Sequence, residues 1–584
     1  MPTKKESLLQ EWKDAITLGI RYRTVYGRSA EWGIYKNMYR GYWGGKIVPV
    51  NILYAVARSL IPQLYFRNPR VEVLPRRPGF GPHAQVLTKT DNYLMNETNV
   101  KRECKRLILD AYICGVGCGI HGYDSEFGYS PSFQLDNYFE FSDTSNTQED
   151  DKGNRLEYND NIKPGMPWFV RSNPLDFVVP WGTTYWEDAR WFAFRKMRPL
   201  RDIMEDPKYT NKTDLAGPYR SVADRPHEGQ QSTKINIIGE DSKEEYVELY
   251  EIHDKRTKRV YTISLDHPKF LRNEFDYLQV EGMPAQVLQF NEDPDYFWCA
   301  PDARHIRVQQ DELNDIRTMA RAHRRVALLK VIADKNISSE ELEKFIDGNP
   351  STMMRVDVGP TGDIRKLIHL VQAHVPPDLT IAAREVREDI REIIGFSRNQ
   401  MGAFEAPSGR RTAYETEVVR AASMIRVDER RDEMAELLTR VVRTYNQIIF
   451  ENWNEERIAD IVGPDGARYW VKYTGKEIAG EFDYKVNIEE AIPMDIRTRR
   501  NDALELIKTA LTTQQGVPNG LDLKYLIESY AKQFGDWLDP QMLFPNAGLG
   551  RNPDQAMPFN QYLQKFPGGQ SAYPSLGGEF GGQG

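Results

Sequence analysis

Arginine is the residue type whose spacing in this sequence most clearly indicates chemistry. Two segments with helical periodicity carry arginines three or four residues apart, a spacing that puts the guanidinium groups of each segment on one stripe. The stripes are Arg317, Arg321 and Arg324 in the first segment and Arg384, Arg387 and Arg391 in the second. A polar segment after the second stripe contains Arg398, Asn399, Gln400, Arg410 and Arg411. Guanidinium groups bind phosphate and carboxylate oxygens, so the expected partners are nucleic acid or acidic side chains of a neighbouring chain.

Signatures of enzymes are missing from the sequence. It contains no G-x-x-x-x-G-K-[ST] phosphate loop and no H-E-x-x-H zinc motif. Cys114 and Cys118 have no second Cys or His pair at zinc spacing, so we interpret them as two buried thiols. The glycines between 115 and 122 follow a helical segment and precede a strand-like one, the reverse of a dinucleotide-binding turn; they predict a closely packed helix-to-strand corner. We therefore predict a protein that is not an enzyme and that binds no cofactor or metal.

Composition narrows the class of protein further. The chain of 584 residues has a formal net charge of −8, with 40% hydrophobic and 28% charged residues, which is enough apolar material for a folded core. Four cysteines indicate a reducing compartment, and the charged N-terminus has no signal-peptide core. No apolar stretch reaches the ~18 residues of a membrane span. The negative net charge of the chain disfavours a domain that binds DNA tightly over a broad basic face.

The first half of the sequence predicts an α+β fold. Residues 8–60 show two or three helices and are rich in aromatic residues, for which core packing and a contact surface between subunits are both possible. Residues 62–300 predict a mixed domain with a strand at 70–75, a helix over 85–114 and mainly strands from 119 to 267.

The second half is more helical. Periodicity predicts two helices, over 302–328 and 378–394. Between them we expect an insert with a strand at 328–332, a helix after Ser338 and a hairpin of strands 353–358 and 364–370. A helix over 412–453 would be about 60 Å long. A hairpin (458–473), a strand (484–488) and helices (496–513, 522–534) follow, and residues 541–584, with nine glycines and no helical period, predict a flexible tail.

The two helices around the insert carry charge on several faces and cannot form a sealed core alone. Two interpretations follow. The helices form a solvated hairpin, or they pack laterally in a symmetric ring with one charged face toward a lumen.

In this order of elements the chain resembles the portal proteins of tailed bacteriophages, the head-to-tail connectors through which DNA enters and leaves the capsid. Each matching passage is short, but their order covers most of residues 30–540. The passages are VNILYAVARSL at 50–60, YFRNP at 65–69, YICGVG at 112–117, NPLDF at 173–177, EDARW at 187–191, QDELN at 310–314, IGFS at 394–397 with Met401-Gly402, and RTAYETE at 411–417.

The resemblance implies a portal-like elongated subunit with a helical stem, an α/β clip, a mixed α/β wing with a long spine helix, and a helical crown. The implied parts are wing (1–300 and 413–494), stem helices (301–328 and 377–394), clip (329–376), tunnel loop (395–412) and crown (495–540), followed by the Gly-rich tail (541–584). Family members form homo-oligomeric rings of about twelve subunits. The implied partners are double-stranded DNA, the terminase, the major capsid and scaffold proteins and the tail adaptors, with no membrane. The implied location is the virion, at the portal vertex of the capsid, after assembly in the host cytoplasm.

A channel of this kind must let DNA slide, so a net-acidic wall with few arginines is expected, because every phosphate contact adds salt-dependent affinity. Arg398, Asn399, Gln400, Arg410 and Arg411 would line the constriction. The two stem stripes (Arg317, Arg321 and Arg324; Arg384, Arg387 and Arg391) would support them, and for these stripes lateral Arg–Glu pairs between neighbouring helices are the alternative. Other classes that we considered are a terminase-like packaging enzyme, which needs the missing phosphate loop, and a different head-completion protein of the capsid.

Overall fold

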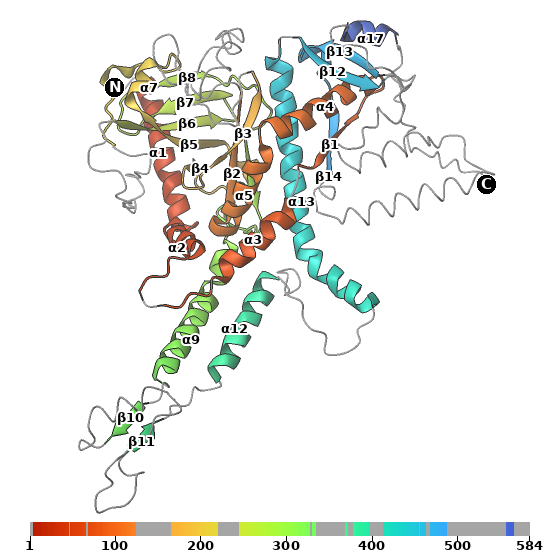
Figure 1. The fold of residues 1–584 in the computed structure, drawn as a ribbon. Coiled ribbons are helices and arrows are strands. Elements are labelled where there is room, and N and C mark those ends of the chain that lie inside the picture. Colours follow the sequence, from red (N-terminus) through yellow and green to blue (C-terminus); the bar gives the residue numbers. More distant parts are fainter. Residues whose placement is uncertain are drawn as a thin grey trace, which may run out of the picture. The chain divides into compact units, whose positions relative to one another are not determined.

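The chain folds into two compact units. Unit 1 contains Met1–Gly33, Ala57–Pro301 and Tyr414–Gly584, and unit 2 contains Ile34–Val56 and Asp302–Ala413. The structure is a computed structural model (Figure 1) that describes residues 4–45, 47–65, 68–123, 165–219, 245–326, 330–333, 368–371, 378–395, 413–454, 456–462, 468–487 and 556–565. The predicted helix after Ser338, the hairpin turn at 359–362, the loop residues 396–412 and the helices 496–513 and 522–534 lie outside these residues.

The largest sheet of unit 1 has five antiparallel strands in the order β4-β5-β6-β7-β8. The strands are β4 (Phe177–Val178), β5 (Trp191–Pro199), β6 (Tyr246–Asp254), β7 (Arg259–Ile263) and β8 (Arg272–Phe275). Alternation along β5 gives the sheet two apolar faces. Phe192 and Phe194 stack on His253 on one face, while Trp191 and Ala193 belong to the core on the other. The α+β class predicted from the sequence is thus confirmed.

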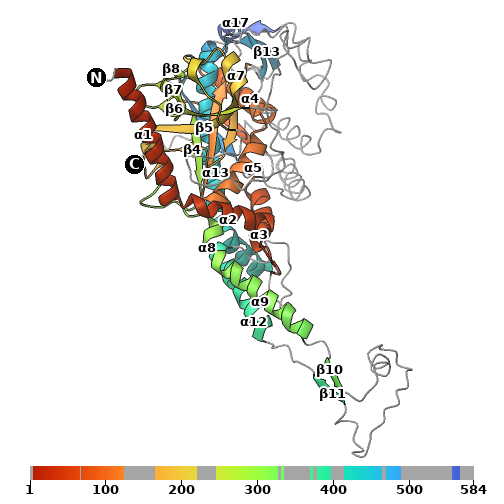
Figure 2. The same cartoon turned by 90° about the vertical axis from the view of Figure 1, so that its left-hand side faces the viewer.

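Helix α1 (Lys4–Val25) covers the second face of this sheet (Figure 2). Leu9, Ile16 and Ile20 recur at helical spacing and are buried against the sheet residues of the same core. Core packing is also the role of several other N-terminal aromatics. Tyr22, Trp32 and Tyr35 are each only 1% exposed, whereas Tyr42 is 70% exposed.

A second sheet of unit 1 has the order β3-β2-β9, with β2 (Val116–Tyr123) antiparallel to both β3 (Pro167–Ser172) and β9 (Ala285–Gln289). The predicted tight corner before β2 is confirmed. Gly115 has φ +89°, and a Cβ there would collide with the carbonyl oxygen of Cys299. A Cβ on Gly117 would lie 2.5 Å from the carbonyl oxygen of Leu107. The glycines are therefore needed because backbone segments approach each other closely.

The single helix predicted over 85–114 is wrong, because two helices occupy this region. Helix α4 (Gly81–Glu97) and helix α5 (Val100–Cys114) are separated by Thr98 and Asn99. The Thr98 hydroxyl donates to the carbonyl oxygen of Leu94 (2.8 Å), and Asn99 adopts a left-handed backbone with φ 50°. Asn is one of the few residues that tolerate this conformation, so it can end one helix and begin the next.

Helix α13 (Ala413–Asn452) confirms the long helix predicted over 412–453 and is about 60 Å long. Figure 1 shows it running through unit 1. Its second half is surrounded on several sides. The Tyr445 and Thr98 hydroxyls are 3.2 Å apart, Gln286 of β9 donates to the Thr444 hydroxyl (3.3 Å), and Ile448 packs on Leu278 and Val280.

The strands after α13 were predicted correctly. β12 (Arg457–Val462) and β13 (Arg468–Tyr473) form an antiparallel pair, and β14 (Phe482–Asn487) pairs with β1 (Arg70–Pro75). The tail prediction is wrong for residues 557–565. There β15 (Met557–Pro558) adds to β13, and helix α17 (Phe559–Lys565) buries Phe559 and Tyr562. The Phe559 ring packs edge-on against His83 of α4, so two aromatic residues anchor a segment whose composition predicts disorder.

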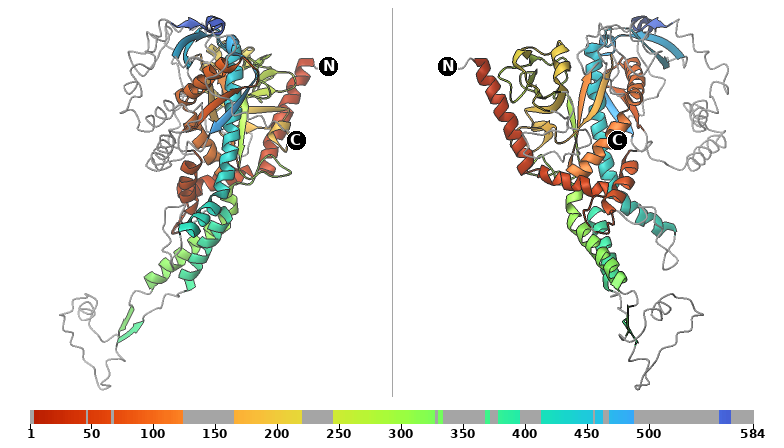
Figure 3. Two further views of the ribbon diagram at one scale, coloured as in Figure 1. Left: turned by 90° about the vertical axis from the view of Figure 1, so that its right-hand side faces the viewer. Right: turned by 60° about the vertical axis from the view of Figure 1, so that its left-hand side comes forward.

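Unit 2 contains the helix pair that the sequence predicted. Helix α12 (Asp378–Ile394) has the predicted bounds, and the helix predicted over 302–328 consists of α8 (Asp302–His305) and α9 (Arg307–Val326). Figure 3 shows α9 and α12 side by side. The chain leaves α9 for β10 (Lys330–Ala333) and returns to α12 from β11 (Ile368–Val371), and the two strands pair antiparallel. The remaining described elements are α2 (Ser29–Arg40), α3 (Ile52–Leu64), α7 (Leu200–Glu205) and the 3₁₀ turns η1 (Trp186–Asp188), η2 (Lys212–Asp214) and η5 (Lys476–Ile478).

Candidate functional site: an arginine groove between two helices

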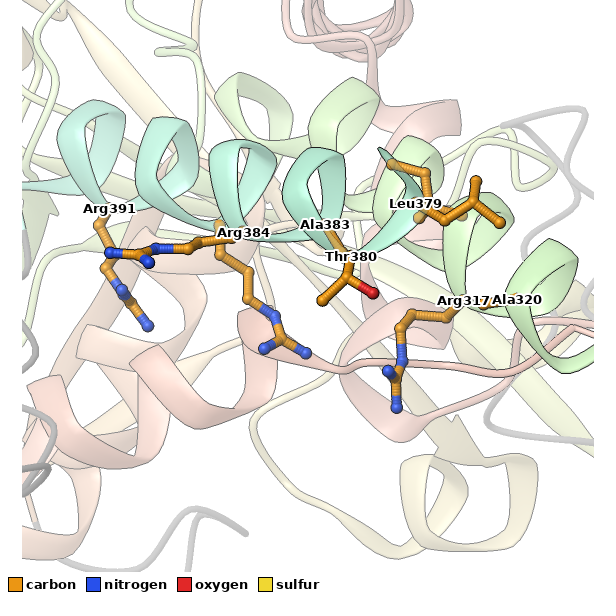
Figure 4. A pocket seen from close by; sticks show the side chains of 9 residues that line it. Arg317, Ala320, Leu379, Thr380, Ala383, Arg384 and Arg391 are labelled. Atoms are coloured by element: carbon orange, nitrogen blue, oxygen red, sulfur yellow. The ribbon is translucent and has the colours of Figure 1, made fainter. Parts of the chain in front are cut away.

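Four of the predicted stem arginines line one groove between α9 and α12. Arg317 comes from α9, and Arg384, Arg387 and Arg391 come from α12. The groove has a volume of about 560 Å³, and its other lining residues are Ile316, Ala320, Leu379, Thr380 and Ala383. In Figure 4 the side chains of Arg317, Arg384 and Arg391 extend to the same side of the two helices. The groove therefore combines several guanidinium groups with an apolar floor.

The antiparallel direction of α9 and α12 explains why the arginines meet. Ile316 of α9 and Ile390 of α12 are buried, and in both helices an arginine directly follows this isoleucine. One residue turns an α-helix by about 100°. In two antiparallel helices, the residue after each inward-facing position points to the same side of the pair. Arg317 and Arg391 consequently line one groove although 74 positions separate them in the chain.

The three arginines of the first predicted stripe do not all line the groove. Arg317 lines the groove and is half-buried, whereas Arg321 and Arg324 are exposed and are not among its lining residues. The Nε of Arg324 donates to the carbonyl oxygen of Ala320 in its own helix (3.3 Å). The second stripe stays together, with Arg384, Arg387 and Arg391 all in the groove.

One arginine of the groove already pairs with a carboxylate of its own helix. The Nε of Arg384 donates to Glu388 at 3.1 Å, an exposed pair at i and i+4. The Nε of Arg317 is buried and has no hydrogen-bond partner in the part of the chain that the structure describes. Each guanidinium group has five N–H donors in a planar arrangement suited to carboxylate or phosphate oxygens. The groove is therefore a site for anionic groups that carry apolar neighbours.

A second polar feature of α9 was not predicted. Gln310, Asn314 and Thr318 recur every four residues and hold the extended segment before α3. The Thr318 hydroxyl accepts from the backbone N–H of Val48 (3.0 Å), and the Asn314 side chain accepts from that of Val50 (2.8 Å).

Gln310 completes this ladder, because it accepts from the Ile52 N–H (3.1 Å) and donates to the Val50 carbonyl oxygen (2.6 Å). Gln310 and Asn314 are 0% and 2% exposed. The signal that the sequence offers is the four-residue spacing of these polar side chains, which places them on one stripe of a helix.

The predicted constriction residues cannot be placed. Arg398, Asn399, Gln400, Arg410 and Arg411 lie outside the described residues.

The four thiols and His121 of unit 1 are enclosed in the packed interior of the fold. Cys104, Cys114, Cys118 and Cys299 are all buried, which confirms the interpretation of Cys114 and Cys118 as buried thiols. Burial raises the pKa of Cys118 well above its usual value and that of Cys299 to about 12. Burial also lowers the pKa of His121 to about 3, and its ring packs on Phe169. Protonated thiols and a neutral, enclosed imidazole are poor nucleophiles and poor proton carriers at neutral pH.

No protein-family model matches this sequence, and no curated protein is similar to it. In the portion of the chain that the structure covers, no three His, Cys, Asp or Glu side chains come together as metal ligands. Within the same portion, every helix is too short or too polar to span a bilayer.

Proposed function

We propose that this chain is a portal protein, the subunit of a ring-shaped channel at a capsid vertex through which double-stranded DNA is packaged and ejected. The observation that carries the proposal is the organisation of unit 2. Helices α9 and α12 run antiparallel, the segment that joins them contains the β10–β11 pair, and the long helix α13 follows α12 in the chain. This is the succession of stem, clip and spine that the sequence resemblance implies.

In this proposal α9 and α12 are the stem helices, and the segment around β10 and β11 is the clip that contacts the terminase motor and later the tail adaptors. The chain itself catalyses no reaction, and its ring of about twelve copies is located in the virion. The net charge of −8 per subunit gives such a ring an acidic character, which limits the number of phosphate contacts that would slow DNA. The exposed Arg321 and Arg324, together with the tunnel-loop arginines, would be the DNA-facing cations.

Electron microscopy of the purified full-length protein tests the proposal. We expect closed rings with a central channel at moderate salt. A chain that stays monomeric at every salt and protein concentration would contradict the portal function. ATP hydrolysis by the isolated chain would also contradict it and would favour a packaging enzyme.

The DNA-facing role is tested separately. We expect Arg410→Ala together with Arg411→Ala to leave rings intact and to change the retention of packaged DNA, because these residues are proposed to line the narrowest part of the channel. Loss of rings in this variant would instead assign the two arginines to contacts between subunits.

A further inference from the structure

The helix pair α9/α12 has a second face whose charge is opposite to that of the arginine groove. Asp315 and Asp389 lie two positions before Arg317 and Arg391, and two residues turn a helix by about 200°. Each aspartate directly precedes the buried isoleucine, so both helices carry the tripeptide Asp-Ile-Arg at their contact. The antiparallel arrangement that gathers the arginines on one side therefore places both aspartates on the other side.

This acidic face, defined by Glu312, Asp315, Met319, Asp389 and Ile393, is exposed. Met319 and Ile393 each lie three residues after the buried isoleucine and are 47% and 40% exposed. Among the described residues, Asp315 and Asp389 have no salt-bridge partner. This face therefore combines carboxylates with apolar side chains.

The arginine groove has the complementary properties. Its guanidinium groups would receive carboxylates, and its floor of Ile316, Ala320, Leu379 and Ala383 would receive apolar side chains. A DNA backbone would use the guanidinium groups but not the apolar floor, because it presents phosphates and sugars only. The groove and the acidic face match in both charge and polarity.

We propose that the arginine groove receives the acidic face of α9/α12 from a second copy of this chain. This inference rests on the proposed portal function and specifies the contact that joins its subunits. Because the two surfaces differ and lie on opposite sides of the pair, each copy contacts one neighbour through its groove and another through its acidic face. Contacts of this head-to-tail kind close into a ring when the rotation per subunit allows it. The groove arginines thus hold the subunits together.

Charge reversal on each face tests the contact. Variant A carries Asp315→Lys and Asp389→Lys, and variant B carries Arg384→Glu, Arg387→Glu and Arg391→Glu, which leaves Arg317 as the one arginine among the described residues that line the groove. Alone, A has two basic surfaces and B has two acidic ones, so each should need at least about a tenfold higher concentration to assemble. An equimolar mixture should assemble like the wild type. The basic face of A fits the acidic groove of B, and the unchanged acidic face of B fits the unchanged arginine groove of A.

Assembly is followed by sedimentation velocity and negative-stain microscopy, and helical circular dichroism confirms that each variant is folded. The matched control is Arg307→Glu, which reverses a half-exposed charge of α9 outside both surfaces. It should assemble at wild-type concentration.

The alternative occupant gives a different result. If duplex DNA occupies the groove, variant B forms normal rings and binds a duplex more weakly than variant A at low salt. That outcome, or a mixture that assembles no better than A and B alone, overturns the proposed contact and leaves the portal function standing. A wild-type protein that never assembles contradicts the portal function itself.

Discussion

At the scale of single residues, Asp91 of α4 is a buried carboxyl group that holds a proton at neutral pH. It is 1% exposed, and one oxygen of its carboxyl group accepts a hydrogen bond from the Asn446 side chain of α13 (3.0 Å). Burial raises the pKa of Asp91 to about 8. The folded protein therefore keeps a proton that the unfolded chain loses near pH 4, and stability should fall as the pH rises from about 4 to about 8.

We expect Asp91→Asn to remove this pH dependence, because the amide is neutral in both states. Relative to wild type, the free energy of unfolding of the variant should increase by on the order of 1 kcal/mol per pH unit between pH 5 and 7. Urea denaturation at several pH values measures the difference. Glu72→Gln, which replaces an exposed carboxylate on β1, is the control, and an equal pH trend in both variants would show that Asp91 is not the cause.

Also at this scale, the sequence located the groove arginines but not their arrangement. Helical spacing alone grouped Arg317 with Arg321 and Arg324, whereas the groove groups it with the arginines of α12. Periodicity defines stripes on one helix but does not say which side of a stripe the neighbouring helix covers. The Asp-Ile-Arg tripeptide was a usable signal, but it also occurs at 363–365 and 495–497, so the tripeptide by itself does not identify a helix contact.

At the scale of elements, the hydrogen-bond ladder of α9 positions the segment before α3. We expect Asn314→Ala to leave the Val50 N–H without its acceptor and to weaken this attachment by about 1–3 kcal/mol. Hydrogen–deuterium exchange should then become faster at Val48, Val50 and Ile52. Arg321→Ala on the exposed side of the same helix should leave their exchange unchanged. Unaltered exchange in Asn314→Ala would show that other contacts hold the segment.

Most elements with strong periodicity were predictable, including α12 with its bounds and α13 to within a residue at each end. The break between α4 and α5 was not, because Thr98 and Asn99 interrupt an apolar period that otherwise continues. Helix α17 was missed for the opposite reason. Its composition is polar, and contacts with distant parts of the chain stabilise it, among them the burial of Phe559 and Tyr562 and the hydrogen bond from Asn560 to Glu477. Local propensity predicts elements that form through their own pattern and fails where distant packing decides.

At the scale of the whole molecule, the two units are interleaved along the chain. The chain enters unit 2 at Ile34 and again at Asp302, and it returns to unit 1 at Ala57 and at Tyr414. Within unit 1, β1 pairs with β14, more than 400 positions later in the sequence. Within unit 2, α9 and α12 come from the two sides of the segment that carries β10 and β11. Each unit is thus completed by residues from both halves of the sequence.

This interleaving has a consequence for a broken chain. A single cut between Ala333 and Ile368 produces two fragments, and each contributes one member of the α9/α12 pair and one strand of the β1–β14 sheet. We expect the fragments to stay together through gel filtration after such a cut and to separate only in denaturant. Two fragments expressed separately should complement each other when they are mixed. Fragments that part in native buffer would contradict this expectation. Fragments that complement each other in this way would allow each half of the protein to be isotope-labelled separately.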